Sequence, residues 1–198
     1  MVLSVCAFSM MDVLVKWSEN YPVGQVLFFR GICGLIPIFF LIPKEKYTNF
    51  YKTDRPKLHF ARCAAGLMAI VSIFIALRNL PLATVVSISF AAPIFATILS
   101  IYFLSEKIGK YRWLAVFIGF LGVIIITQPG ISTLNFYYIY PIIFCLGMSY
   151  VAIAIRQLST SEPVWLISFY FSLAISILGL FTVPFGWVMP TVFDFILL

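Results

Sequence analysis

The chain has 198 residues, of which 63% are hydrophobic and only 10% are charged, against about 25% charged residues in a typical soluble domain. Its mean hydropathy of +1.08 excludes a soluble globular protein, and it excludes disorder, which requires low hydrophobicity and high net charge. The net charge of +6 does not indicate nucleic-acid binding, because the basic residues lie in short loops between apolar runs. These runs are continuous rather than alternating, so the sequence predicts an all-α polytopic membrane protein.

Seven apolar runs are long enough to cross a hydrocarbon core, which takes about 17–25 helical residues. In chain order they are Met1–Trp17, Gly24–Ile42, Leu58–Leu77, Leu82–Leu104, Tyr111–Gln128, Phe136–Ile155 and Val164–Val183. An eighth run starts at Phe195 and stops with the chain, and the first run starts at residue 1. Both ends look cut, so the sequence predicts a fragment or a truncated gene model.

Lysine and arginine gather in the loops on one side of the predicted helices. The loops on that side are Pro43–Lys57, Ser105–Arg112 and the loop that starts at Arg156; those on the other side are Ser18–Val23, Arg78–Pro81, Pro129–Asn135 and Pro184–Asp194. The first group carries nine of these basic residues and the second carries only Arg78. Basic loops stay in the cytoplasm, so we expect a cytoplasmic N-terminus.

The first two runs align weakly with the sixth and seventh, which indicates an internal repeat. The aligned pairs are Ser9 with Ser149, Lys16 with Arg156 and, after one inserted residue, Pro22 with Pro163, Phe28 with Phe169 and Phe29 with Tyr170. A repeat of five spans enters the membrane from the opposite side in its second copy, as in many secondary transporters. The sequence therefore predicts a ten-helix fold of two inverted five-helix repeats, with a first repeat at 1–130 and an incomplete second repeat at 131–198. By the same logic about three further spans are expected, and the 198-residue form alone is expected to transport nothing.

Several motifs resemble those of the EamA-type carriers of the drug/metabolite transporter superfamily. They are Leu77–Thr84 (LRNLPLAT), Ser89–Phe95 (SFAAPIF), Phe103–Ile108 (FLSEKI) with Arg112 and Trp113, and Gly119–Val123 (GFLGV). Asp12–Lys16 (DVLVK) and Phe28–Arg30 (FFR) are similar to the subgroup that contains S-adenosylmethionine uptake carriers. The resemblance implies a carrier of the bacterial inner membrane for a small polar organic solute, which is a metabolite, an amino-acid-like or an S-adenosylmethionine-like compound.

Three ionisable residues inside the first two runs are candidates for solute binding. A charged residue within a span costs about 2.5–3.5 kcal/mol on insertion scales, so the presence of each one indicates a structural or functional role. Asp12 and Lys16 are spaced i, i+4 and share a helix face. Arg30 lies at a similar depth in the next, antiparallel run. We expect the three side chains to form one charged cluster, which either locks the two helices together or binds a solute or coupling ion. A third alternative is that Lys16 only extends its ammonium group to the membrane interface.

A second set of candidates lies on the fourth and sixth runs. In a helix, Ser89, Pro93, Thr97 and Ser100 fall within about 80° of one another, which predicts a polar stripe. Pro93 cannot donate to the Ser89 carbonyl, so a bend is expected there. Either the stripe lines a cavity or the bend is bonded to a neighbouring helix, since lipid cannot satisfy a freed carbonyl. Ser149 and Tyr150 place a further pair of hydroxyls in the sixth run.

Other functional classes fit the sequence less well. An intramembrane serine protease needs a base near its nucleophile, and the single histidine, His59, is at the wrong depth. A metalloprotease would need an HExxH-like cluster, which the sequence lacks. A retinal receptor would need a lysine in Val164–Val183, which contains none. A channel would usually show a filter loop or a ring of like charge, and the sequence shows neither. The sequence predicts a transporter and no enzyme, without cofactor or metal, whose partners are the lipid bilayer and the solute. A homodimer, a seven-helix receptor and a non-transporting structural membrane protein remain open.

Two further groups of residues are interpreted as structural. His59 and Arg62, at the start of the third run, are expected to be solvated anchors at the membrane surface. The four cysteines are Cys6, Cys33, Cys63 and Cys145. They lie inside apolar runs without CxxC spacing or a neighbouring histidine, so we expect small buried apolar side chains.

Overall fold

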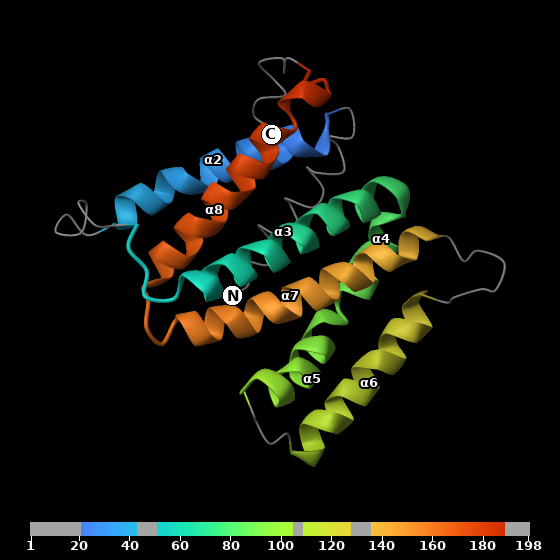
Figure 1. Cartoon of the computed structure of the whole chain (residues 1–198). Helices are drawn as coiled ribbons and strands as arrows, with labels where there is room; N and C mark the ends of the chain where they lie inside the picture. Colours follow the sequence, from blue (N-terminus) through green and yellow to red (C-terminus); the bar gives the residue numbers. More distant parts are fainter. Residues whose placement is uncertain (1–20, 43–50, 105–108, 128–135, 189–198) are drawn as a thin grey trace. The chain divides into compact units, whose positions relative to one another are not determined.

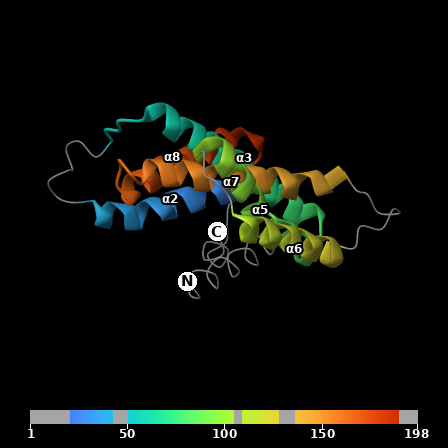
Figure 2. The ribbon, with the colours of Figure 1, turned by 90° about the horizontal axis from the view of Figure 1, so that it is seen from below.

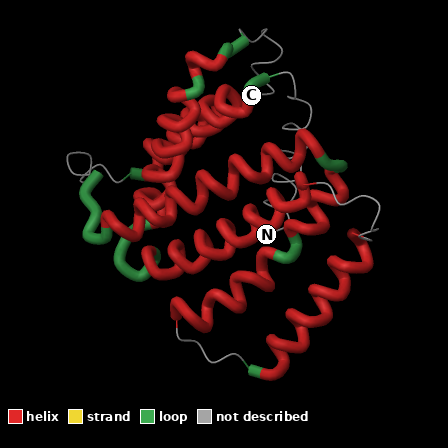
Figure 3. Tube along the Cα trace, turned by 45° about the vertical axis from the view of Figure 1, so that its right-hand side comes forward, coloured by secondary structure: helices red, strands yellow, loops and turns green. Residues whose placement is uncertain are grey.

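The computed structural model describes residues 21–42, 51–104, 109–127 and 136–188. The described ranges consist of helices joined by turns and loops, and they contain no strand (Figure 3). Five helical segments within them are apolar and long enough to cross a membrane: Val23–Leu41, Pro56–Asn79, Leu82–Leu104, Phe136–Leu158 and Val164–Phe181. The prediction of a polytopic helical membrane protein is therefore confirmed. The predicted first span and the start of the eighth lie outside the described residues.

The described helices start and end within a few residues of the predicted runs. They are α2 (Val23–Leu41), α3 (Pro56–Asn79), α4 (Leu82–Ser89), α5 (Ala92–Leu104), α6 (Lys110–Thr127), η3 (Phe136–Tyr138), α7 (Ile139–Leu158), α8 (Val164–Phe181) and η4 (Val183–Phe185). Helix α6 occupies the predicted fifth span, but its apolar helical stretch, Trp113–Gly122, is shorter than a full span.

Prolines mark where four of these helices begin. Pro22, Pro81 and Pro163 directly precede α2, α4 and α8 with extended ψ angles of 140°, 138° and 148°, and Pro56 is the first residue of α3. A proline fits at a helix start because its missing N–H would have no partner there, and its φ angle is already helical. The chain therefore sets these four helix starts by local sequence alone.

The chain divides into two compact units, and the first unit comprises Met1–Lys52 with Pro163–Leu198. Within it, α2 packs along α8 (Figure 1). A Cβ atom on Gly179 of α8 would lie 2.6 Å from the backbone nitrogen of Phe28, and one on Gly31 of α2 would lie 2.9 Å from the Ser172 carbonyl oxygen. Small residues on both helices thus allow the close backbone approach that favours helix association in lipid.

The second unit comprises Thr53–Glu162. In this unit α3 packs along α7 (Figure 1), and α5 packs against α7. Helix α6 lies beside α5 (Figure 2). Gly147 on α7 faces α3 so closely that an added Cβ would lie 2.9 Å from the Ala65 carbonyl oxygen. Cys63 and Cys145 are buried, as predicted. The same prediction is wrong for Cys33 of the first unit, which is exposed.

Candidate solute-binding site

The predicted fourth span is broken into α4 and α5 at Phe90 and Ala91. Pro93 is the second residue of α5, and its nitrogen has no hydrogen to donate to the Ser89 carbonyl one turn back. The helical ladder therefore stops at Ser89 and restarts at Ala92. The bend predicted from Pro93 is confirmed, and it takes the form of a break between two helices.

Helix α7 supplies hydrogen-bond donors to the carbonyl groups around this break. The Cys145 thiol lies 3.3 Å from the Ile88 carbonyl oxygen and 3.8 Å from that of Ser89. The Ser149 hydroxyl lies 2.8 Å from the carbonyl oxygen of Ala92 and 2.6 Å from that of Cys145 in its own helix. The sequence predicts that the bend either lines a cavity or is bonded to a neighbouring helix. These contacts are those of a break that is bonded to a neighbouring helix, α7.

The hydroxyl groups of the predicted polar stripe bond back to their own helices. Ser89 donates to the Val85 carbonyl, Thr97 to that of Pro93 and Ser100 to that of Thr97, each at 2.8 Å. The stripe can still contact a solute, because a carbonyl or hydroxyl oxygen retains further acceptor capacity. Tyr150 lies against α5, where its ring packs edge-on to Phe103 with centroids 5.5 Å apart. Solute binding by Ser89, Pro93, Thr97, Ser149 and Tyr150 stays a prediction.

Replacing Ser149 with alanine is expected to weaken the packing of α7 on the α4–α5 break. The change removes a donor from a partly buried carbonyl, and an unsatisfied acceptor costs about 1–3 kcal/mol. Thermal unfolding in detergent should show a lower midpoint for Ser149→Ala. Ser87→Ala is the matched control, because the Ser87 hydroxyl donates only within its own helix. Equal midpoints for the two variants would show that Ser149 does not support the break.

Only one member of the predicted charged cluster lies within the described residues. Arg30 is half-buried on α2, in the first unit. Asp12 and Lys16 lie outside the described residues, so the cluster stays a prediction. In the same unit, Gln25 is a buried polar residue that no pattern in the sequence indicates, and it is 1% exposed. Its amide donates to the Val188 carbonyl oxygen at 2.7 Å and accepts from the Val188 N–H at 3.1 Å.

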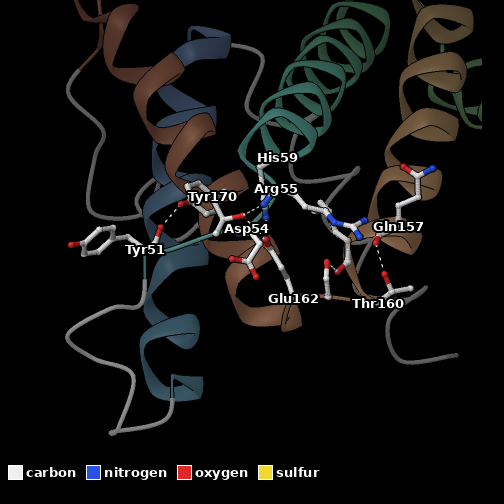
Figure 4. A network of polar contacts seen from close by, with 11 residues as sticks. Tyr51, Asp54, Arg55, His59, Gln157, Thr160, Glu162 and Tyr170 are labelled. Atoms are coloured by element: carbon white, nitrogen blue, oxygen red, sulfur yellow. Dashed lines mark hydrogen bonds and ion pairs between the residues drawn. The ribbon is translucent and has the colours of Figure 1, made fainter.

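A buried ionic contact, which the sequence does not indicate either, lies at one end of the second unit. Glu162, in the loop after α7, lies against His59 near the start of α3, and both side chains are 3% exposed (Figure 4). The other carboxylate oxygen of Glu162 accepts from the Thr53 hydroxyl and, at 3.1 Å, from the Asp54 N–H. The interpretation of His59 and Arg62 as solvated anchors is wrong, because both are buried. Folding encloses His59 between the segment before α3 and the loop after α7.

The surroundings of Glu162 favour its charged form. Burial alone would raise the pKa of this carboxyl, but the hydrogen bond from Thr53 and the hydrogen bond and charge of His59 outweigh it. The Asp54 N–H adds to the same effect. The pKa of Glu162 is therefore lower than that of an ordinary glutamic acid, and the carboxylate is ionised at neutral pH.

The lowered pKa of Glu162 predicts a loss of stability in acid. A carboxyl whose pKa is lower in the folded than in the unfolded chain stabilises the fold above the unfolded pKa, about 4.3 for glutamate. This contribution disappears as the pH falls through the folded pKa. Thermal midpoints of the unmodified chain and Glu162→Gln, measured from pH 7 to pH 3.5, should therefore differ by a constant amount above about pH 5 and converge in acid. A difference that stays constant, or grows in acid, would contradict the assignment.

Comparison with known proteins places these features in a family. The sequence profile of the EamA-like transporter family matches residues 1–128. The chain is 26% identical over 201 residues to the S-adenosylmethionine uptake transporter of Rickettsia bellii, covering 100% of the chain and 68% of that protein. It is 28% identical over 190 residues to the pseudopaline exporter CntI of Pseudomonas aeruginosa, covering 94% of the chain and 64% of the exporter.

A riboflavin transporter of Brucella anthropi is 27% identical over 146 residues, which are 72% of the chain and 51% of that transporter. The chain thus spans between half and about two thirds of the length of these relatives, and all three are transporters rather than enzymes. The family profile covers more than half of the chain, and the described helices are those of a multi-pass membrane protein. The chain belongs to the EamA-like transporter family and is a multi-pass membrane transporter of small solutes.

Proposed function

We propose that this protein is a secondary transporter that moves a small polar organic solute across a bacterial inner membrane by alternating access. The observation that carries the proposal is the similarity to a transporter of S-adenosylmethionine, a solute with carboxylate and cationic groups, which extends over the whole of this chain and 68% of that transporter. The basic loops support a cytoplasmic N-terminus. The proposed partners are the bilayer and the solute, with a homodimer as the alternative to a monomer.

The proposed architecture is a ten-helix fold of two inverted five-helix repeats, with the first repeat at residues 1–130. The greater length of the relatives supports it. So does the weak repeat that aligns Lys16 with Arg156. In transporters of this type the solute site lies between the repeats near the middle of the membrane, often where helices are interrupted. The break between α4 and α5 is such an interruption, which supports the placement of Ser89, Pro93 and Thr97 at the solute path.

The proposed solute contacts combine opposite charges with hydroxyl groups. Arg30 has the guanidinium fork that matches a carboxylate, and Asp12 and Lys16 would add one charge of each sign to the same cluster. An amino-acid-like solute carries both signs of charge, so it would satisfy such a cluster better than a neutral solute. Ser149 and Tyr150 would contribute hydroxyl groups from the sixth span.

An uptake screen tests this proposal. The complete gene product is purified and reconstituted into liposomes, and S-adenosylmethionine, amino acids and nucleosides are offered one at a time. Uptake is followed by radiolabel or mass spectrometry. We expect saturable uptake of at least one zwitterionic solute above that of protein-free liposomes, and less uptake with Arg30→Met at equal protein content. Saturable uptake that is unaffected by Arg30→Met would overturn the proposed site, and no uptake of any of these solutes would overturn the proposed solute class.

A further inference from the structure

The chain passes between its two compact units twice. A carboxylate at the second passage accepts hydrogen bonds from residues at the first passage. The passages are Lys52–Thr53 and Glu162–Pro163, so Thr53 and Glu162 are the first and last residues of the second unit. They lie 109 positions apart in the sequence, and the Thr53 hydroxyl donates to a Glu162 carboxylate oxygen. The Asp54 N–H donates to the same oxygen at 3.1 Å. The two connections are therefore bonded to each other within the second unit.

The contact is buried and charged, which distinguishes it from an ordinary loop contact. Glu162 is 7% exposed and is the only buried acidic side chain among the described residues. Its second carboxylate oxygen lies against Nε2 of His59. A buried carboxylate is stable only when its acceptor sites are filled. Here both oxygens are filled by groups from the segment before α3 and from its first turns, so that Glu162 has a defined position relative to both connections.

A similar contact exists within the first unit, just before the first passage. The Tyr170 hydroxyl of α8 donates to the Tyr51 carbonyl (Figure 4). Helix α8 begins at Val164, directly after the second passage. In the first unit, Tyr51 beside the first passage is thus bonded to Tyr170, the seventh residue of α8. In the second unit, Thr53 and Asp54 beside the first passage are bonded to Glu162 at the second passage.

We propose that Glu162 is a positioning residue whose contacts with Thr53, Asp54 and His59 form a latch. The latch makes the two connections move as a single hinge when the units change their relative position. This inference rests on the proposed alternating access, since a transporter that alternates must move parts of its fold against one another. A single hinge restricts that motion to one path, so the latch sets how fast the states interconvert and does not contact the solute.

Hydrogen–deuterium exchange in detergent, without any solute, tests the latch directly. Glu162→Ala removes every contact of the carboxylate. We expect exchange about tenfold faster both in the peptide that contains Asp54 and in the peptide that covers 158–162, the scale of losing one charge-assisted hydrogen bond. Exchange in the turn at 158–162 reports on the latch because the N–H groups of Ser161 and Glu162 donate to the Leu158 carbonyl oxygen. Loss of the Glu162 contacts should let this turn open more often. Peptides from α8 should not change.

Two further variants keep the test decisive. Asp54→Asn is the control, because it removes a neighbouring exposed carboxylate and leaves the Asp54 N–H in place. Thr53→Val replaces Glu162→Ala if the latter does not fold, and it should also speed exchange in both peptides. Faster exchange in one peptide only, or an effect no larger than that of Asp54→Asn, would overturn the latch.

Transport of labelled S-adenosylmethionine by the reconstituted protein gives the second readout. At equal folded protein, Glu162→Gln should change the turnover number and leave KM unaltered, because the latch acts on the motion and not on solute binding. A change confined to KM would show that Glu162 acts on the solute site and would overturn the latch. If the unmodified protein transports no S-adenosylmethionine, that result counts against the proposed solute, and the exchange experiment alone decides on the latch.

Discussion

Replacing Gly179 with alanine should disrupt the pairing of α2 with α8 and sharply reduce the amount of folded protein. The added Cβ atom would lie 2.6 Å from the Phe28 nitrogen and 2.7 Å from the Gly24 carbonyl oxygen. These are backbone atoms, so no rotamer change can relieve the overlap, and the two helices must move apart. Overpacking of a close-packed site typically costs about 1–3 kcal/mol, and we expect a value at the upper end.

Gly122 of α6 provides the matched control for this experiment. A Cβ atom there would meet nothing within 4 Å, and alanine has the higher helix propensity. The monodisperse yield from detergent and the thermal midpoint should therefore fall for Gly179→Ala and stay level for Gly122→Ala. A Gly179→Ala protein as stable as the Gly122→Ala protein would mean that α2 and α8 do not pack this closely.

Neutralising Asp12 alone, or Arg30 alone, should harm the protein more than neutralising both. This holds if Asp12 pairs mainly with Arg30 within the proposed cluster, because each single change then leaves the other charge of the pair uncompensated inside the membrane. Breaking a buried pair in this way costs about 3–5 kcal/mol in soluble proteins. The variants are Asp12→Asn, Arg30→Met and the double mutant, and the measurement is a double-mutant cycle on folded yield, with uptake followed in parallel.

The cycle also separates the two roles that the cluster could have. If the charges only fasten helices, the double mutant should recover both folding and transport. If they bind the solute or a coupling ion, as proposed, folding should recover and transport should stay lost. Strictly additive losses of folded yield would mean that Asp12 and Arg30 do not interact, and the cluster would then be abandoned.

Features that depend on local sequence could be predicted, and the helix positions are the main example. Long apolar runs fix the spans because lipid leaves the backbone no other partner. Prolines fix several helix starts, and Pro93 fixes the break between α4 and α5 because it removes one specific hydrogen bond. The position of these features needs no knowledge of which helices are neighbours.

Features that depend on distant pairing could not be predicted in the same way. Glu162 lies 103 positions from His59, and nothing in the segment around either residue indicates the other. When Glu162 is not known to be its neighbour, a histidine near a helix start is interpreted as a solvated anchor at the membrane surface. The sequence shows Ser149 as a polar residue in a span, but its contact with the Ala92 carbonyl depends on the packing of α7 against α5, which no local pattern encodes.

Counterflow in proteoliposomes tests alternating access most directly. Liposomes that contain the protein are loaded with an unlabelled solute identified by the uptake screen and then diluted into a trace of the same solute carrying a label. A transporter that exposes its site to one side at a time exchanges outgoing for incoming solute, so the label should rise transiently above its equilibrium level inside before it declines. A monotonic approach to equilibrium, equal in loaded and empty liposomes, would be the behaviour of a channel and would contradict the proposed mechanism.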